Sequence, residues 1–145
     1  MAKVKTKVHN DFGIFLDEES KERLKILSDK IVDKSWKLFC HHMTIAFNNG
    51  TDEVQKEYDK YKDRFGEVVE IYATHIGISD DAIAVKIDFK PGTLTNFPHV
   101  TIATPKGGKP VKSNYITNWK PLSIHIKLSG KISAFYYIIL LSCLL

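Results

Sequence analysis

Two short segments of the chain carry the same set of residues capable of acid–base chemistry. The pattern His-x-Thr-Ile-Ala occurs at residues 42–46 and again at residues 99–103. An imidazole can give or take a proton near neutral pH, and a threonine hydroxyl can donate a hydrogen bond to developing negative charge. Two such pairs facing one reacting group would supply a base, an acid and two donors. The candidate catalytic residues are His42, Thr44, His99 and Thr101.

Both segments are expected to be β-strands, because their apolar residues alternate with these polar ones. Residues i, i+2 and i+4 of a strand share a face, so each strand would present a histidine, a threonine and an alanine to one side. The residues expected to pack behind them in the core are Met43, Ile45, Phe47, Val100 and Ile102. By the same alternation, His41 should point away from the site.

The length and composition indicate one globular domain. With 145 residues, of which 43% are hydrophobic and 26% charged, the chain is long enough to bury a core. We assign residues 1–138 to this domain and residues 139–145 to an apolar C-terminal tail. Ile132–Ile138 is expected to be a final core strand. The uncharged run of residues 132–145 is shorter than the roughly 20 apolar residues that span a bilayer, and a membrane anchor and a non-native end remain alternatives for this end of the chain.

Charge is distributed unevenly along the sequence. Residues 91–145 contain six lysines and no Asp or Glu, whereas residues 41–90 contain ten acidic and six basic residues. This distribution favours an anionic ligand near the second motif, although a solvated Lys-rich surface would give the same pattern. Lys106 and Lys109, in a loop with two glycines, are the candidate phosphate- or RNA-binding residues. That loop is a phosphate clamp or an ordinary flexible loop, and it is not a P-loop.

The remaining segments should position the two motif strands. We expect a strand at Phe12–Leu16, followed by a helix that Asp17 caps and that runs to about Asp33. A second helix is indicated by apolar residues from Val54 to Phe65, with a stop at Gly66. A hairpin should follow, with its strands at residues 68–78 and 82–89. His75, in the first of these strands, is expected to be structural or partly exposed.

Cysteine usage and the N-terminal sequence favour an intracellular protein. Cys40 and Cys143 have neither metal-ligand spacing nor a disulfide framework, and the first residues do not read as a signal peptide. We expect a cytoplasmic or nuclear protein, a monomer, with no membrane association.

The two motifs, 57 residues apart, resemble those of the 2H phosphoesterase superfamily. The chain is most similar to the cyclic phosphodiesterase domain of plant- and fungal-type tRNA ligases. This resemblance rests on residues 97–104, Gly108-Lys109-Pro110 and Asn114, and in pattern it covers roughly Phe12 to Lys131. It implies an α+β fold with two pseudo-symmetric halves, in which antiparallel sheets flank a cleft and helices lie outside. The chain has no room for the ligase and kinase domains of those enzymes.

The resemblance implies a metal-independent phosphodiesterase that opens 2′,3′-cyclic phosphates on RNA ends or nucleotides, with a 2′-phosphate as product. His42 and His99 would be the acid–base pair, without a cofactor, and which one is the acid stays open. Hydrolysis of 2′-5′-linked oligonucleotides is the alternative within the superfamily. A zinc site at His41, His42 and His99 and a non-catalytic RNA-binding module are the alternatives outside it. A separate RNA ligase or kinase is left open as a partner.

Overall fold

A computed structural model describes residues 11–135 and has an α+β fold. Within these residues the strands are β1 (Phe12–Leu16), β2 (Lys37–Leu38), β3 (His42–Ala46), β4 (Val68–Ile78), β5 (Ile83–Asp88), β6 (His99–Thr104) and β7 (Trp119–Ala134). The helical segments are α1 (Glu18–Asp29), α2 (Asp52–Tyr61) and two 3₁₀ turns, η1 (Lys62–Arg64) and η2 (Pro110–Tyr115).

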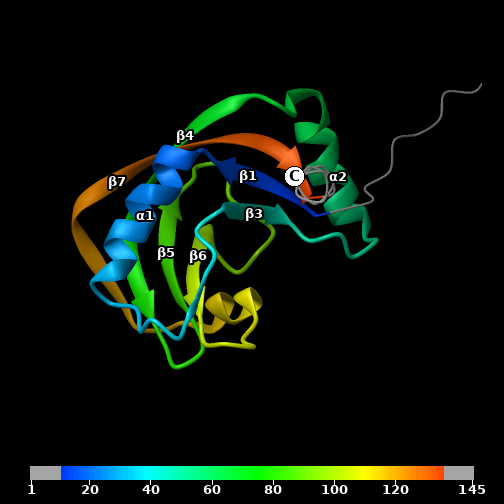
Figure 1. Cartoon of the computed structure of the whole chain (residues 1–145). Helices are drawn as coiled ribbons and strands as arrows, with labels where there is room; N and C mark the ends of the chain where they lie inside the picture. Colours follow the sequence, from blue (N-terminus) through cyan, green and yellow to red (C-terminus); the bar gives the residue numbers. More distant parts are fainter. Residues whose placement is uncertain (1–10, 136–145) are drawn as a thin grey trace, which may run out of the picture.

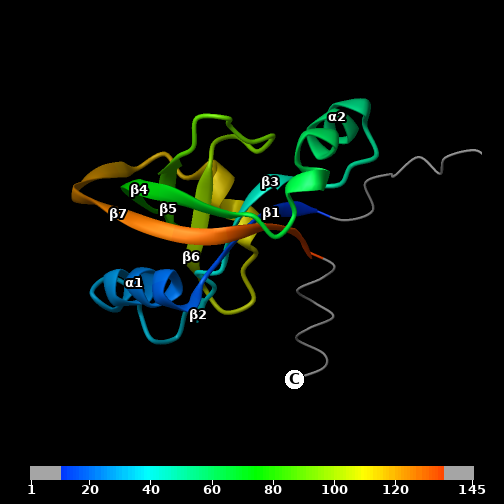
Figure 2. The same ribbon diagram turned by 90° about the horizontal axis from the view of Figure 1, so that it is seen from above.

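The described strands form one sheet that closes on itself (Figure 1). Antiparallel neighbours follow in the order β6-β3-β1-β7-β4-β5, and β5 pairs with β6 to complete a six-stranded barrel. The short strand β2 pairs with Ala103 and Thr104 at the end of β6. Helix α1 contacts β7 and β6, whereas α2 contacts β3, so the two helices lie over different strands of the barrel (Figures 1 and 2).

One row of apolar side chains crosses all six barrel strands. Its members are register partners on adjacent strands, so their side chains share a face, and all are buried except Ile76, which is partly buried. The row consists of Ile132, Ile14, Met43, Val100, Val85 and Ile76. Because residues alternate along a strand, the histidine and threonine of each motif lie on the opposite face from this core.

The prediction for the first strand and the N-terminus of the first helix is confirmed. β1 spans Phe12–Leu16, and the Asp17 carboxylate accepts a hydrogen bond of 2.8 Å from the backbone N–H of Ser20. Helix α1 is four residues shorter than expected. It ends at Asp29, and just beyond this end the carbonyl of Ser28 accepts hydrogen bonds from the N–H groups of Ile31 and Val32.

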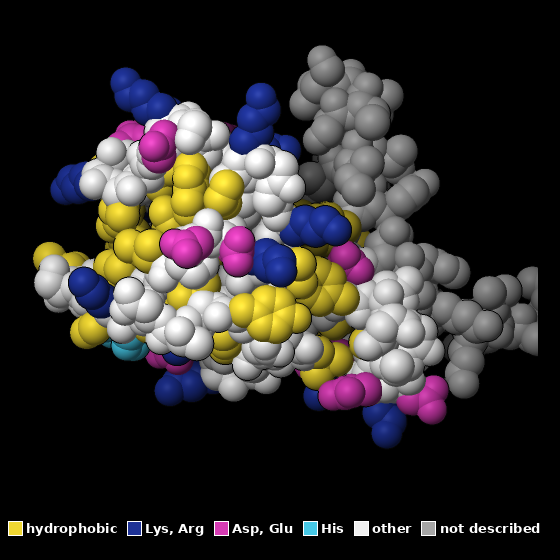
Figure 3. Space-filling model, turned by 90° about the horizontal axis from the view of Figure 1, so that it is seen from below, with side chains coloured by type: hydrophobic (Ala, Val, Ile, Leu, Met, Phe, Trp, Pro, Cys, Tyr) yellow, Lys and Arg dark blue, Asp and Glu magenta, His cyan; other side chains and the backbone are white. Residues whose placement is uncertain are grey.

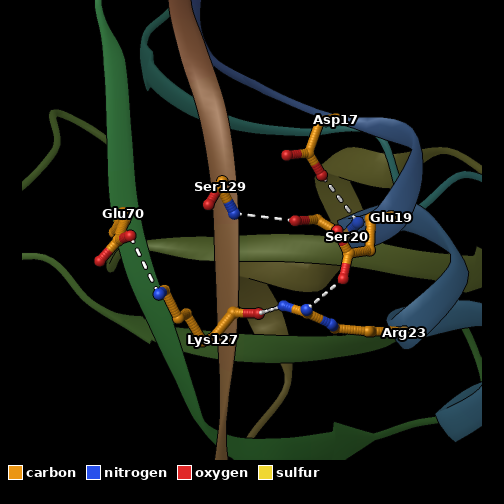
Figure 4. A network of polar contacts seen from close by, with 7 residues as sticks. All are labelled: Asp17, Glu19, Ser20, Arg23, Glu70, Lys127 and Ser129. Carbon is orange, nitrogen blue, oxygen red and sulfur yellow. Dashed lines mark hydrogen bonds and ion pairs between the residues drawn. The ribbon is translucent and has the colours of Figure 1, made fainter.

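Helix α1 is held against β7 by polar contacts (Figure 4). The Ser20 hydroxyl accepts a hydrogen bond of 2.8 Å from the backbone N–H of Ser129, and the Arg23 guanidinium donates to the carbonyl of Lys127 at 2.7 Å. Arg23 also pairs with Glu19 on its own helix. These contacts fix the start of α1, and therefore the end of β1, to the longest strand of the barrel.

The following hairpin agrees with the sequence analysis, whereas the second helix is shorter than expected, because α2 ends at Tyr61 and the chain continues to Arg64 as the 3₁₀ turn η1. Thr51 caps α2, and the expected aromatic stripe is core, because Tyr58, Tyr61 and Phe65 all pack against the ring of Phe12. Gly66 follows with a φ of +94°, a conformation that favours glycine. The strands of the hairpin are β4 and β5, and His75 on β4 is partly exposed, as expected.

Strand β3 ends before Phe47, and the final described strand begins well before Ile132. Phe47 was expected in the core, but β3 ends at Ala46 and the side chain of Phe47 is 42% exposed. The last described strand is a single 16-residue strand that ends at Ala134. The rest of the expected strand to Ile138 and the tail at residues 139–145 lie outside the described residues. Between residues 11 and 135 no helix is both long and apolar enough to cross a membrane.

Candidate active site

The two motif strands lie side by side but touch along very little of their length. β3 and β6 share one register pair, Met43 with Val100. Beyond this pair the strands separate, and a cavity of about 420 Å³ opens over the motif face. It is lined by Phe39, His41, His42, Thr44, Phe47, His99, Thr101, Lys109, Pro110, Val111, Asn114 and Phe135. All four predicted catalytic residues therefore line one cavity.

The motif side chains are held in place by the way each strand is buried. Met43 and Ile45 on β3, and Val100 and Ile102 on β6, are fully buried on the core side, as the sequence analysis predicted. On the cavity side Thr44, His99 and Thr101 are only 7–8% exposed. The motif alanines, Ala46 and Ala103, are buried and do not line the cavity.

His99 is anchored by a backbone carbonyl. Its Nδ1 atom lies 2.8 Å from the carbonyl oxygen of Phe97, and this oxygen can only accept a hydrogen bond. Nδ1 therefore carries a proton, and in the neutral ring Nε2 has the free lone pair. Burial lowers the pKa of His99, although the hydrogen bond to Phe97 acts in the opposite direction. The lowered pKa favours the neutral form of His99 at neutral pH.

His42 sits in a more apolar environment at the start of β3. The rings of Phe15 and Phe135 pack against it, with centroids 5.6 and 4.5 Å away. Burial lowers the pKa of His42 to about 3, with smaller contributions from the nearby His41 and His99. Both motif histidines line the same cavity.

His41 does not point away from the site, contrary to the sequence analysis. It lines the cavity, and its Nδ1 atom is 3.3 Å from Nδ1 of His42. The alternation argument fails because β3 begins at His42, so that His41 belongs to the preceding connection and need not follow the strand. Partial burial of the ring, followed by the charges of Lys21 and Lys37, lowers the pKa of His41.

The hydroxyl of Thr101 is oriented by the turn η2, which the sequence analysis did not anticipate. Thr101 Oγ1 lies 2.8 Å from Ser113 Oγ and 3.3 Å from the carbonyl oxygen of Pro110. Ser113 is completely buried. When the Ser113 hydroxyl donates to Thr101, the Thr101 hydroxyl donates in turn to the carbonyl of Pro110, and it would have to rotate away from that carbonyl to donate to a ligand.

One of the two predicted lysines reaches the cavity. Lys109 lines it, whereas Lys106 is exposed and is not one of the lining residues. Of the described residues that line the cavity, Lys109 is the one Lys or Arg, and none is acidic. On the face shown in Figure 3, hydrophobic side chains reach the surface between scattered basic and acidic ones, without a continuous basic patch. A preference of the cavity for an anion would therefore arise at Lys109.

The walls of the cavity are largely aromatic and apolar, which the sequence motifs did not reveal. Phe39, Phe47 and Phe135 come from three different parts of the chain and line the same cavity. Asn114, which the resemblance singled out, is also in the wall. Its Nδ2 donates to the carbonyl of Val111, while its buried Oδ1 makes no hydrogen bond to any described residue.

The zinc alternative finds no supporting ligand set in the part of the chain that the structure describes. No group of three or more His, Cys, Asp or Glu side chains between residues 11 and 135 is placed to hold a metal ion. His41, His42 and His99 share the cavity, but they do not form such a group.

The comparisons with known proteins leave the geometry as the basis for a functional argument. No protein-family model matches the chain. No curated protein matches its sequence either.

Proposed function

We propose that this protein is a metal-independent 2′,3′-cyclic phosphodiesterase that acts on RNA ends or nucleotides and leaves a 2′-phosphate. The observation that carries the proposal is the convergence of both His-x-Thr motifs on one cavity, from strands that are 57 residues apart in sequence. Neither motif alone could do this chemistry, because hydrolysis needs a proton acceptor for water and a proton donor for the leaving oxygen on the opposite side.

The mechanism follows from the arrangement of the side chains. A cyclic phosphate placed between His42 and His99 would have an imidazole on each side of the phosphorus. One imidazole takes a proton from the attacking water, and the other protonates the ribose oxygen as its bond to phosphorus breaks. The hydroxyls of Thr44 and Thr101 donate hydrogen bonds to the non-bridging oxygens as their charge increases.

The surroundings of the cavity suit a small anionic group attached to an apolar or aromatic one. Lys109 can neutralise part of the phosphate charge, and no acidic side chain among the described lining residues opposes it. The phenylalanine rings offer flat surfaces on which a nucleobase can stack, a contact worth about 1–3 kcal/mol per base. The proposal also includes two pseudo-symmetric halves in the fold and a role in RNA processing.

The decisive experiment is turnover of a short RNA that ends in a 2′,3′-cyclic phosphate, with EDTA present. We expect a 2′-phosphate product from the native chain and a rate reduced by roughly 10²–10⁴-fold in both His42→Ala and His99→Ala, because each loses one proton-transfer group. His125→Ala, at an exposed position on β7 that does not line the cavity, is the matched control and should keep the native rate.

Other outcomes would replace the proposal. Turnover of a 2′-5′-linked oligonucleotide in place of the cyclic phosphate would indicate the alternative substrate at the same site. RNA binding without turnover, retained in both histidine variants, would identify a binding module. Loss of turnover in EDTA would contradict a metal-independent mechanism.

A further inference from the structure

The two motif histidines have different partners for the same ring atom. Nδ1 of His99 meets a carbonyl oxygen, whereas Nδ1 of His42 meets another imidazole nitrogen, Nδ1 of His41, at 3.3 Å. The rings of His41 and His42 are nearly parallel, with an angle of 16° and centroids 5.5 Å apart. His41 lies outside the His-x-Thr pattern, and nothing in the proposed mechanism yet uses it.

The hydrogen bond between two imidazoles restricts where their protons can be. One Nδ1 must carry the shared proton and the other must accept it. If His41 donates, neutral His42 holds its own proton on Nε2 and has no lone pair there. If His42 donates, its Nε2 is left free, as Nε2 of His99 is. The state of His42 is therefore tied to that of His41, whereas the carbonyl of Phe97 leaves His99 no such choice.

We propose that His41 is a positioning residue that accepts the Nδ1 proton of His42, and that this pair acts as the proton donor while His99 acts as the base. The assignment of acid and base rests on the proposed function. The hydrogen bond between the two rings does not, because it follows from their geometry alone, and its direction is what the tautomer of His42 tests.

The pair offers a way to place a positive charge in an apolar cavity. When a phosphate anion binds, the pair takes up a proton from solvent on Nε2 of His42, while the proton already held between Nδ1 of His42 and Nδ1 of His41 stays shared. That Nε2 proton moves to the leaving ribose oxygen as the oxygen–phosphorus bond breaks. Meanwhile His99 Nε2 takes a proton from the water whose oxygen bonds to phosphorus. Both histidines then return to their starting states by exchange with solvent.

The charged and titratable neighbours make protonation of the pair depend on a bound anion. His41 faces the fields of Lys21 on α1 and Lys37 on β2, while His42 faces His41 and His99, and Lys109 lines the same cavity. These positive or potentially positive groups oppose protonation of the pair in the empty cavity. A bound phosphate reverses that balance, so the acid is formed when the substrate is present.

The test of the hydrogen bond is nitrogen NMR of the histidine rings at pH 7 in the native chain and in two variants. His41→Phe keeps a flat ring beside Phe39 and His42 but removes the acceptor. His41→Asn restores an acceptor near the position of Nδ1. We expect His42 with its proton on Nδ1 in the native chain and in His41→Asn, and on Nε2 in His41→Phe. His99 is the internal control and should keep its proton on Nδ1 in all three.

The test of the role is the rate on the RNA with a 2′,3′-cyclic phosphate. We expect His41→Phe to lower kcat roughly tenfold to hundredfold, the usual effect of removing a partner that orients a functional histidine, with KM little changed and kcat largely restored in His41→Asn. A native kcat in His41→Phe would overturn the role.

The two measurements separate the inference from the function on which it partly rests. A His42 ring that has the same tautomer in all three proteins, or that carries its proton on Nε2 in the native chain, overturns the inference whatever the activity. If the native chain has no turnover but the NMR result is as expected, the proposed function fails while the pairing of His41 with His42 stands.

Discussion

At the scale of single residues, the two motifs are chemically alike but differently supported. The hydroxyl of Thr101 is held by Ser113 and the carbonyl of Pro110, both from η2. His99 is held by the carbonyl of Phe97, just before its own strand. The second motif is therefore oriented by backbone carbonyls and a buried serine. The first depends on the paired ring of His41 and on the packing of Phe15 and Phe135.

The Thr101 hydroxyl should be needed for rate and for stability. Thr101→Val keeps the shape of the side chain but removes the donor to the phosphate, so we expect kcat on the cyclic phosphate to fall by about 10²–10³-fold. It also leaves Ser113 without its partner, which should lower the free energy of unfolding by about 1–3 kcal/mol. Turnover assays and urea unfolding measure the two effects.

Thr101→Ser is the control for this prediction, because it keeps the hydroxyl. It should retain most of the activity. A Thr101→Val protein that is as active as the native chain would show that this hydroxyl does not stabilise the transition state.

At the scale of elements, β1 is the strand that supports the first motif. It lies between β3 and β7, and its register with β3 shifts between Phe12 and Gly13. A side chain at Gly13 would collide with the backbone carbonyl of Met43, which immediately precedes Thr44 on the motif strand. The absence of a Cβ at this position thus lets β1 approach β3 closely.

Gly13→Ala should therefore damage the site without changing any of its side chains. We expect the free energy of unfolding to fall by about 1–3 kcal/mol, because the strands must move apart, and we expect turnover to fall as β3 shifts. Ser133→Ala, at the register partner of Gly13 on β7, is the control and should leave both nearly unchanged. Thermal unfolding and the turnover assay provide the measurements, and native values for Gly13→Ala would show that β3 does not depend on this contact.

At the scale of the whole molecule, closure of the sheet creates the site. Six strands form the barrel, yet β3 and β6 are joined by a single register pair. The row of apolar residues that runs through Met43 and Val100 holds the two strands together on the core side. Beyond this register pair the two strands separate, and η2, which lies beside β6 (Figure 1), borders the cavity.

Burial of neutral histidine in this closed structure should make its stability depend on pH. The pKa of His42 is about 3 in the folded state, against 6.5 for an unperturbed histidine. The stability gained from a neutral His42 is complete above pH 6.5 and is lost as the pH falls from 6.5 toward 3, because only the unfolded chain takes up the proton. The free energy of unfolding, measured in urea, should decrease from pH 7 to pH 5. This decrease should be smaller by about 2 kcal/mol in His42→Asn than in the native chain.

His125→Asn, at an exposed position, serves as the control and should keep the native dependence on pH. Equal decreases in the native chain and in His42→Asn would mean that His42 is protonated in the folded protein at pH 5.

Local structure and the identity of the motif residues could be predicted from the sequence. Alternation predicted β3 and β6 and the core positions of Met43, Ile45, Val100 and Ile102, because one-sided burial of a strand has a period of two. Asp17 and Gly66 marked helix ends, because capping and positive φ are properties of one or a few residues.

The way in which these parts form a cavity depends on contacts between segments that are far apart in sequence, and it is visible in the tertiary structure alone. Which strands are neighbours depends on how the sheet closes, so no local pattern could show that β3 and β6 meet at a single pair. The places of His41, Phe47, Ser113 and Phe135 depend on where strands end and which turn covers them. The likeness of the two motifs was visible in the sequence. The different partners of His42 and His99 were not, because they come from contacts that form when the chain folds.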